Sequence, residues 1–429
     1  MGYKRAWSTT GVVALTGALL LTSAPIASAD YIRDAQWPLT VYDAEKVWKT
    51  SEGEGVTVAV IDTGVDATHP DLTGQVLPGK DFNGGDPHED SNGHGTGMAS
   101  LIAGHGHGVN NSAGVIGLAP KAKILPVRAE VDGQMSRNWS EGVRYAVDQG
   151  AKVINLSFND DGSVPGTARA EAIAYAQKHD VVVVAGTGND AGTVSYPAAL
   201  PGVVAVTALD KNLDFWNDSN TGKGVTLAAP GAEVPVADPT TSNGYANATG
   251  TSNATAYVSA IAALIRSKYP DLTAGQVINR LLKSASFLQH KGKKAPDSEL
   301  GYGIARPGTA LTMDIPAGPK QGPLAQPVPS KSAHSAAGSE SNDSKAEAKS
   351  SSGSIFLIGG IAAVVVVIAI LFAVIRSRRN GGSGSGGGFP PQGPGYPSYP
   401  PAGHQPNSAA GQGHPTPPGQ GQQRNPYMQ

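Results

Sequence analysis

Three separated stretches of the sequence carry residue types that together could perform acyl transfer. They place an aspartate in AVIDTGVD, a histidine in SNGHGTGMAS and a serine in GTSNAT, at Asp62, His94 and Ser252. A serine hydroxyl becomes an effective nucleophile when a base takes its proton and a carboxylate orients that base. Aspartate, histidine and serine in this chain order form one of the known arrangements of such a triad.

Each of the three residues also has a plain structural interpretation. An aspartate at the end of a strand often caps a turn, a histidine between glycines often lies in a surface loop, and a serine before a helix is often an N-cap. One motif alone does not decide between these alternatives. All three motifs in this order, each in a suitable context, favour a catalytic triad.

The residues around Ser252 predict a buried helix with the serine in its first turn. Residues 250–269 begin with small residues and are apolar at Ile261, Leu264 and Ile265, until Pro270 stops the pattern. The first turn of a helix has N–H groups without an intrahelical partner and carries the positive end of the helix dipole. A serine oxygen in this position lies close to donors that could stabilise a developing oxyanion.

Strand-like and helix-like stretches alternate along the chain before this helix. Residues 56–61 form an apolar run that is typical of a strand buried on both faces, and Asp62 follows directly. This alternation predicts an open α/β sheet, mostly parallel, in which the working residues collect at the carboxyl ends of the strands. The other strand-like runs are 123–127, 152–156, 181–185 and 203–207, and the helix-like stretches are 94–102, 140–149 and 167–179.

With these motifs the chain resembles the subtilase (subtilisin-like serine protease) family, over roughly residues 53–311. The resemblance implies a subtilisin-like fold, with Asp62 as the orienting carboxylate, His94 as the general base and Ser252 as the nucleophile. The stretch VVVVAGTGN is similar to the family's strand that leads to its oxyanion-hole asparagine, which implies Asn189. The alternative for Asn189 is an ordinary turn residue, because asparagine is common in loops.

The resemblance also outlines a substrate cleft. One wall would be the edge segment that pairs with an extended peptide, where backbone hydrogen bonds give affinity and side-chain pockets give selectivity. The other wall would border the first specificity pocket, with small residues that keep its entry open. The two sets are Ser157, Phe158 and Asn159, and Ala185, Gly186, Thr187 and Gly188.

Some positions depart from the family's usual pattern. Many subtilases have a second histidine where this chain has Gly97, and the residues Asn253, Ala256 and Tyr257 after the serine also differ. None of these changes removes a triad member. The changes therefore do not exclude peptidase activity, but they put its catalytic efficiency in question.

An acidic loop precedes His94. Asp81, Asp86, Glu89 and Asp90 could suit calcium, which prefers clusters of oxygen ligands and which some subtilases bind in comparable loops. A solvated loop is the alternative. Spacing alone does not define a ligand geometry, so we assign no metal ligand and no required cofactor.

Composition narrows the functional classes. The 429 residues carry a formal net charge of −2, with nothing that indicates a nucleic-acid partner. The chain has no cysteine, so an exported domain must depend on its hydrophobic core alone.

Both ends of the chain predict export and membrane attachment. Lys4 and Arg5, an apolar run and the small residues at 27–29 are typical of a secretory signal, and an uncleaved N-terminal anchor is the alternative. An uncharged apolar run at 355–375 is long enough to span a bilayer, and the arginines after it place that end in the cytoplasm. The expected parts are a signal peptide (1–29), a lead-in (30–52), a catalytic domain (53–312), a disordered linker (313–354), a transmembrane helix (355–375) and a cytoplasmic Gly/Pro-rich tail (376–429).

This layout, without a long propeptide, most resembles the mycosins, which are membrane-anchored subtilases of type VII secretion systems. The resemblance implies a single-pass cell-membrane protein whose extracellular domain hydrolyses protein or peptide substrates. Components of a type VII secretion complex would be its further partners. The alternatives are a catalytically weak scaffold that stabilises such a complex, and a general surface subtilase. Substrate, cleavage preference and oligomeric state do not follow from the sequence.

Overall fold

The structure is a computed structural model, and it describes residues 27–131, 134–135, 138–160, 164–165 and 167–326. No helix among these residues is long and apolar enough to cross a membrane. The predicted transmembrane helix and tail, most of the signal peptide and most of the linker lie outside the described residues.

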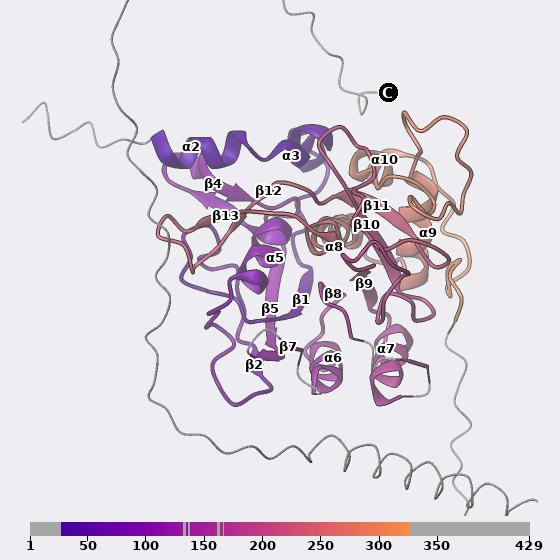
Figure 1. Cartoon of the computed structure of the whole chain (residues 1–429), viewed down its shortest axis with the longest axis horizontal. Coiled ribbons are helices and arrows are strands. Elements are labelled where there is room, and N and C mark those ends of the chain that lie inside the picture. The colour runs from indigo at the N-terminus through magenta and orange to yellow at the C-terminus, as the bar shows by residue number, and fades with distance from the viewer. Residues whose placement is uncertain (1–26, 132–133, 136–137, 161–163, 166, 327–429) are drawn as a thin grey trace, which may run out of the picture. The chain divides into compact units, whose positions relative to one another are not determined.

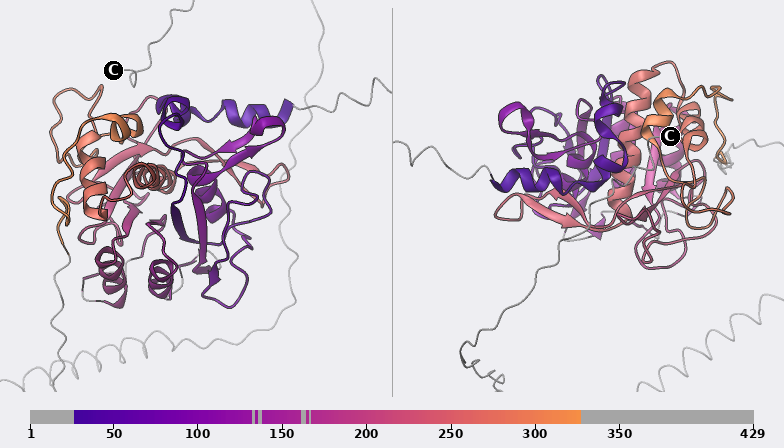
Figure 2. Two further views of the ribbon diagram at one scale, coloured as in Figure 1. Left: turned by 180° about the vertical axis from the view of Figure 1, so that it is seen from behind. Right: turned by 90° about the horizontal axis from the view of Figure 1, so that it is seen from above.

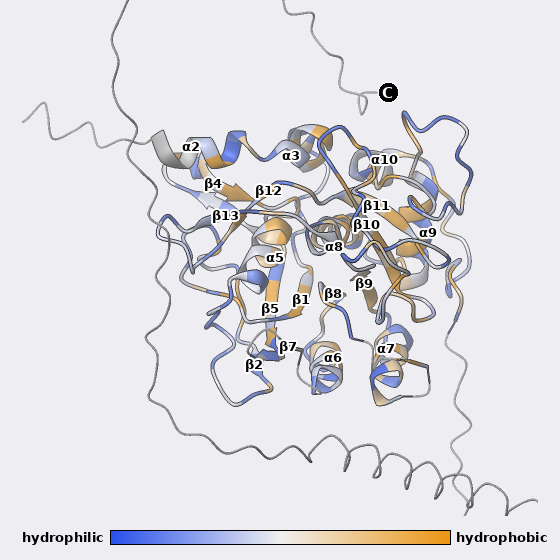
Figure 3. Cartoon of the chain, viewed as in Figure 1, coloured by the Kyte–Doolittle hydropathy of each residue, from blue (hydrophilic) through white to orange (hydrophobic). Residues whose placement is uncertain are grey.

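A seven-stranded sheet, parallel throughout, forms the centre of the domain (Figure 1). Its longer strands are rich in valine, isoleucine and alanine and are largely orange in Figure 3, as expected for strands buried on both faces, whereas the short edge strand 80–81 is charged. In spatial order they are β11 (Leu227–Pro230), β10 (Val204–Leu209), β9 (Val182–Gly186), β8 (Val153–Leu156), β1 (Thr57–Asp62), β5 (Lys123–Arg128) and β2 (Lys80–Asp81).

Helices cover both faces of this sheet, and strand β1 shows why. Val58 and Val60 belong to the hydrophobic cluster on one face, whereas Ala59 and Ile61 belong to the cluster on the other. Successive side chains of a strand point to opposite faces, so an unbroken apolar run needs helices on both. The first face carries α5 (His94–Ala103), α8 (Thr251–Lys268), α9 (Ala274–Ser284) and α10 (Pro307–Thr312), and the second carries α6 (Trp139–Asp148) and α7 (Ala168–Lys178).

The α/β sheet and the strands predicted before residue 210 are confirmed, as are the helices predicted at 94–102, 140–149, 167–179 and 250–269. Strand β11 at one edge was not predicted, because its sequence Leu-Ala-Ala-Pro has no β-branched residue and ends in proline. The small antiparallel ribbons were not predicted either. They are β3 (His105–His107) with β4 (Ala113–Ile116), β6 (Glu130–Val131) with β7 (Gln134–Met135), and β12 (Val234–Ala237) with β13 (Tyr245–Ala248); a short 3-10 helix, η1, covers Val109–Asn111.

The lead-in folds into three short helices that pack on the domain. They are α2 (Ala27–Asp34), α3 (Trp37–Val41) and α4 (Ala44–Trp48), indigo in Figure 2. The indole N–H of Trp48 donates to the Leu118 carbonyl at 3.0 Å. Tyr42 is buried and meets Tyr257 of α8 edge to face, with ring centroids 5.7 Å apart. The segment therefore contributes to the hydrophobic core of the domain.

The chain beyond α10 stays bound to the domain as far as the structure describes it. Arg280 of α9 donates to the carbonyls of Ala310 and Met313, and Thr273 donates to the carbonyl of Lys320 at 2.7 Å. Residues 313–326 thus follow α9 through side-chain to backbone hydrogen bonds. The predicted domain boundary at residue 312 stays a prediction.

Candidate active site

Asp62 and His94 form a hydrogen-bonded pair at the carboxyl edge of the sheet. Asp62 is the last residue of β1 and is 1 % exposed, while His94 is the first residue of α5, with its side chain about one-third exposed at 34 %. The distance between His94 Nδ1 and Asp62 Oδ1 is 2.7 Å, and the same oxygen accepts the Thr63 N–H at 2.9 Å. Because a carboxylate only accepts, Nδ1 carries the proton and Nε2 is left as the basic nitrogen.

A rigid loop presents His94 to this carboxylate. Asp90 is buried and accepts hydrogen bonds from the Gly93 N–H at 2.8 Å, the Thr96 N–H at 2.9 Å and the Thr96 hydroxyl at 2.6 Å. Gly93 has φ +89°, and a Cβ there would lie 2.4 Å from a carboxylate oxygen of Asp238. Only glycine fits this turn without strain. The glycines around His94 therefore serve its placement.

The surroundings of His94 stabilise its protonated form. Burial lowers the pKa of His94, but the charge of Asp62 and its hydrogen bond, assisted by Glu130 and Asp90, outweigh burial and raise the pKa to about 9. The imidazolium that forms during acyl transfer is therefore stabilised before any substrate arrives. The same field also means that the neutral base becomes abundant only at alkaline pH.

Ser252 lies in the first turn of α8, as the sequence predicted, next to residue 157. Its hydroxyl donates to the Ser157 carbonyl at 3.0 Å, and the Ser157 hydroxyl donates to the Ser252 carbonyl at 3.1 Å. The Ser252 proton is thus engaged by the edge segment in this structure and must turn to reach His94. Catalytic hydrogen bonds of free enzymes often tighten only when the substrate binds.

A buried polar chain supports this reciprocal pair. The amide of Asn155, which is fully buried in β8, donates to the Ser157 hydroxyl at 2.9 Å. The side-chain oxygen of Asn155 accepts a hydrogen bond from the hydroxyl of Ser259, which lies further along α8, at 3.0 Å. Buried networks in which every member is satisfied hold their members rigidly. The chain therefore ties the start of α8 to the end of β8.

Asn189 is held by the residue before the nucleophile. Its side-chain oxygen accepts both the N–H and the hydroxyl of Thr251, each at 2.9 Å. This contact leaves the amide Nδ2 group as the donor, and a Cβ built on Gly250 would lie 3.4 Å from that nitrogen. The Ser252 N–H in the first turn is the second available donor. Both donors therefore lie at the start of α8, where the predicted oxyanion hole needs them.

The two expected cleft walls lie on neighbouring strands. Leu156 pairs with Ala185 in the parallel register of β8 and β9, so residues 157–159 and 185–188 leave the sheet side by side. Phe158 packs edge to face on Trp139 with ring centroids 5.3 Å apart, and Asn159 is exposed.

The glycines of the second wall have a packing reason of their own. A Cβ on Gly186 would lie 2.8 Å from the Thr251 hydroxyl, and one on Gly188 (φ +112°) would lie 2.2 Å from the Asn220 amide nitrogen. Thr187 between them is fully buried. Close approach to α8 at Gly186 and to Asn220 at Gly188 therefore requires glycine at both positions, whether or not they border a pocket.

Comparison with known proteins gives the family. A model of the subtilase family matches residues 53–303. Thermitase of Thermoactinomyces vulgaris is 40% identical over 244 residues, which are 56% of this chain and 84% of that protein. This chain belongs to the subtilase family. It is a subtilisin-like serine protease.

Solved mycosin structures are similar to this subtilase as well. MycP1 from the ESX-1 type VII secretion system matches with a TM-score of 0.58 and 29% identity, over 68% of this chain and 88% of that chain. MycP3 protease from the type VII (ESX-3) secretion system matches with a TM-score of 0.57 and 31% identity, over 65% and 88%.

Two of the departures from the usual subtilase pattern have structural roles. Asn253 is buried and its amide donates to the carbonyls of Gly231 and Ala248, both at 3.0 Å, which fixes the turn before the nucleophile. Tyr257 forms the aromatic contact with Tyr42 of the lead-in. These residues therefore adapt α8 to its neighbours and do not enter the hydrogen bonds of His94 or Asn189.

The acidic loop uses much of its charge internally. Asp81 accepts the Gly85 N–H at 3.0 Å and lies 3.3 Å from Arg128, Asp86 accepts the His88 N–H at 2.9 Å, and Asp90 builds the turn before His94. In the part of the chain that the structure describes, no group of three or more His, Cys, Asp or Glu side chains could hold a metal ion.

Sequence reasoning missed several residues that hold the site together, namely Thr63, Asn155, Thr251 and Ser259, and it named Asp90 only as part of the acidic loop. It also missed Glu130, whose charge raises the pKa of His94. Thr63 accepts the Gly95 N–H at 2.8 Å, for instance, and so joins the end of β1 to the start of α5. For Thr63 and Thr251 the signal was adjacency to a triad residue. The others gave no signal, because their contacts depend on the fold.

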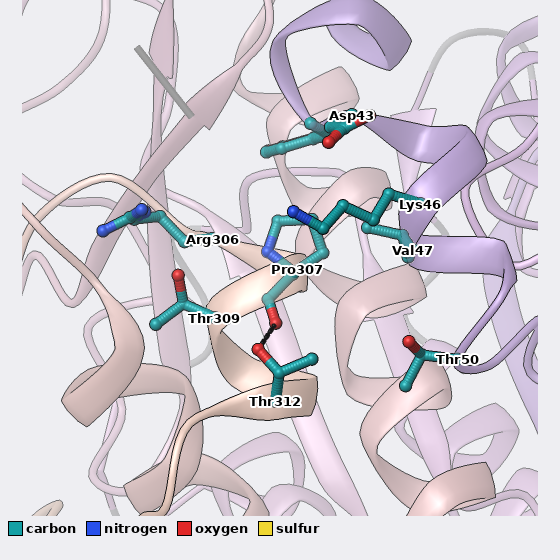
Figure 4. A pocket seen from close by; sticks show the side chains of 10 residues that line it. Asp43, Lys46, Val47, Thr50, Arg306, Pro307, Thr309 and Thr312 are labelled. Carbon is teal, nitrogen blue, oxygen red and sulfur yellow. Dashed lines mark hydrogen bonds between the residues drawn. The ribbon is translucent and has the colours of Figure 1, made fainter. Parts of the chain in front are cut away.

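A separate pocket of about 220 Å³ lies between α4 and the start of α10 (Figure 4). Lys46, Thr50, Arg306 and Thr309 are among its lining residues, and none of the three triad residues is. It therefore lies apart from the candidate active site.

The raised pKa of His94 predicts an alkaline activity profile. Only the neutral imidazole accepts the serine proton, so kcat/KM should rise with pH through a pKa of about 9 and be lost below it. Asp62→Asn should move this rise to lower pH, because burial then dominates, and should lower kcat by about 10⁴-fold. The measurement is kcat/KM of both proteins on one peptide from pH 6 to 10. A wild-type midpoint at or below the ordinary histidine value contradicts the prediction.

Loss of the Asn189 donor should slow turnover with little effect on substrate binding. We expect Asn189→Ala to lower kcat by about 10²–10³-fold, the range known for such a donor in subtilisin, with KM nearly unchanged. The exposed neighbour provides the control: Asp190→Asn should keep kcat. Steady-state kinetics of the three proteins measure this, and an equal effect of both substitutions argues against the oxyanion role.

Proposed function

We propose that the chain is a membrane-anchored, extracytoplasmic serine endopeptidase of the mycosin type that serves a type VII secretion system. The observation that carries the peptidase part is the arrangement at one sheet edge of the Asp62–His94 pair, Ser252 and the Asn189 amide held by Thr251. The mycosin part rests on the structural similarity to MycP1, which covers 68% of this chain, and on the signal and membrane span that the sequence predicts.

The proposed reaction follows from the geometry. A bound peptide places its scissile carbonyl above Ser252, whose oxygen forms a bond to the carbonyl carbon while His94 Nε2 takes the hydroxyl proton. Asp62 stabilises the resulting imidazolium, and the Asn189 amide with the Ser252 N–H binds the oxyanion. His94 then passes the proton to the leaving amine as the C–N bond breaks. A water molecule, deprotonated by His94, releases the acyl group in the same way.

The extracytoplasmic position rests on the sequence at both ends of the chain. In our proposal a signal peptide exports the domain, residues 355–375 anchor it and residues 380–429 stay inside. Because residues 313–326 stay bound along α9, the proposed tether is residues 327–354. A flexible tether of about 28 residues would hold the domain roughly 30 Å from the bilayer. An anchored protease meets proteins that leave a nearby pore at high local concentration, which nutrient digestion would not need.

A second candidate function is a scaffold that keeps the fold and has little activity. The reciprocal hydrogen bonds between Ser252 and Ser157 favour it in one respect, since they engage the nucleophile in the resting state. Reaction of the purified protein with a fluorophosphonate probe separates the two, because only an activated serine is labelled.

Ser252→Ala should abolish proteolysis and probe labelling while the fold stays intact. The change removes one oxygen, and that oxygen makes one hydrogen bond in the described residues, to the Ser157 carbonyl, so the melting temperature should change little. Ser267→Ala, near the far end of the same helix, should keep full activity.

In cells, deletion of the whole chain should impair type VII export more than Ser252→Ala does. Unchanged secreted type VII proteins after deletion would refute the partner assignment and leave the peptidase assignment standing.

The topology has its own test. Protease shaving of intact cells should remove the catalytic domain and spare a tag placed after residue 429. The reason is the run of arginines at the cytoplasmic side of the predicted span. Digestion of the tag in unlysed cells would show that the orientation is wrong.

A further inference from the structure

Glu130 lies beside the catalytic pair. Strand β1 pairs with β5 so that Asp62 is opposite Arg128, and the Ala129 N–H donates to the Asp62 carbonyl at 2.9 Å. Glu130 is the next residue, at the start of β6. It therefore leaves the sheet at the same carboxyl edge as Asp62 and His94.

The Glu130 carboxylate has no compensating cation in the part of the chain that the structure describes. It is half-buried, and it forms no ion pair and no hydrogen bond there. Burial raises its pKa, the charges of Asp62 and Asp90 raise it further, and His94 lowers it. Three carboxylates thus surround one histidine, and Glu130 is the one that keeps an exposed face without a partner.

The direction of a bound peptide makes this charge relevant to substrate choice. The expected walls of the first pocket leave β8 and β9, and the sheet order β9-β8-β1-β5 puts Glu130 on the opposite side of the catalytic pair. In an extended peptide, successive side chains point to opposite sides. If the residue before the scissile bond fills the pocket at β8 and β9, the residue before that one points toward His94 and Glu130.

We propose that Glu130 makes this protease prefer lysine or arginine at the second residue before the scissile bond. A long basic side chain can lie along the apolar part of its path and place its charge at the carboxylate. Attraction at a partly desolvated site is several times stronger than in bulk water, so roughly tenfold discrimination is expected. An acidic side chain in the same place meets Asp62, Asp90 and Glu130 and is disfavoured. This inference rests on the peptidase function and on the strand-like binding of the substrate.

The test uses quenched fluorescent peptides that differ only at that residue, with arginine, lysine, glutamine or glutamate. Wild-type kcat/KM should be roughly tenfold higher for arginine and lysine than for glutamine, and the ratio should shrink as salt is raised. In Glu130→Gln the ratio should fall to about one. Glu141→Gln, an exposed acidic position on α6, is the matched control and should keep the wild-type ratio.

A wild-type ratio near one overturns the proposal, and so does a preference that Glu130→Gln retains. Binding of the same peptides to the full chain with Ser252→Ala gives a second measurement that needs no turnover. Equal affinities for arginine and glutamine peptides there also overturn it. Cleavage of every peptide at equal rates would refute only the role of Glu130, whereas absence of cleavage with selective binding would refute the peptidase function and keep the selectivity.

Discussion

Burial of α8 against the parallel sheet determines where a nucleophile can lie in this protein. The helix packs along β1, β8, β9, β10 and β11, and nearly all its residues are buried. Its first turn therefore points to the edge where the parallel strands end. Parallel strands have their carboxyl ends on one side of a sheet. Asp62 and the segments after β8 and β9 therefore lie at the same edge. The single hydrogen bond between His94 and Asp62 then converts that edge into a site that can hold and move a proton.

The electrostatics of the site show a balance between two demands. Carboxylates near His94 stabilise the imidazolium that acyl transfer needs, and they also keep the base protonated over more of the pH range. A less negative edge would free the base at neutral pH but would support the charged intermediate less. Glu130 belongs to this balance because it adds charge that the triad itself does not require. In our proposal the Glu130 charge also affects which substrate side chain binds beside His94.

Segments outside the family match stabilise a domain that has no disulfide. Tyr42 of the lead-in enters the core against Tyr257, while Arg280 and Thr273 of α9 hold the residues that follow α10. Both ends of the described chain are therefore tied to helices that lie on the same face of the sheet. Each tie adds buried contacts to a domain that has no disulfide to stabilise it.

The sequence by itself determined the chemistry-bearing residues and the fold class. The features that indicate them are local: the order of Asp62, His94 and Ser252, the strand before Asp62 and the apolar pattern after Ser252. Local patterns of this kind can be recognised directly in the sequence. Tertiary structure alone decided how these residues are supported. These supporting contacts join residues that are far apart in the chain. Thr251 is hydrogen-bonded to Asn189, Ser252 is hydrogen-bonded to Ser157, and Glu130 lies near His94. Polar partners of this kind have no periodicity and no preferred spacing, because the packing of α8 and the register of the sheet select them.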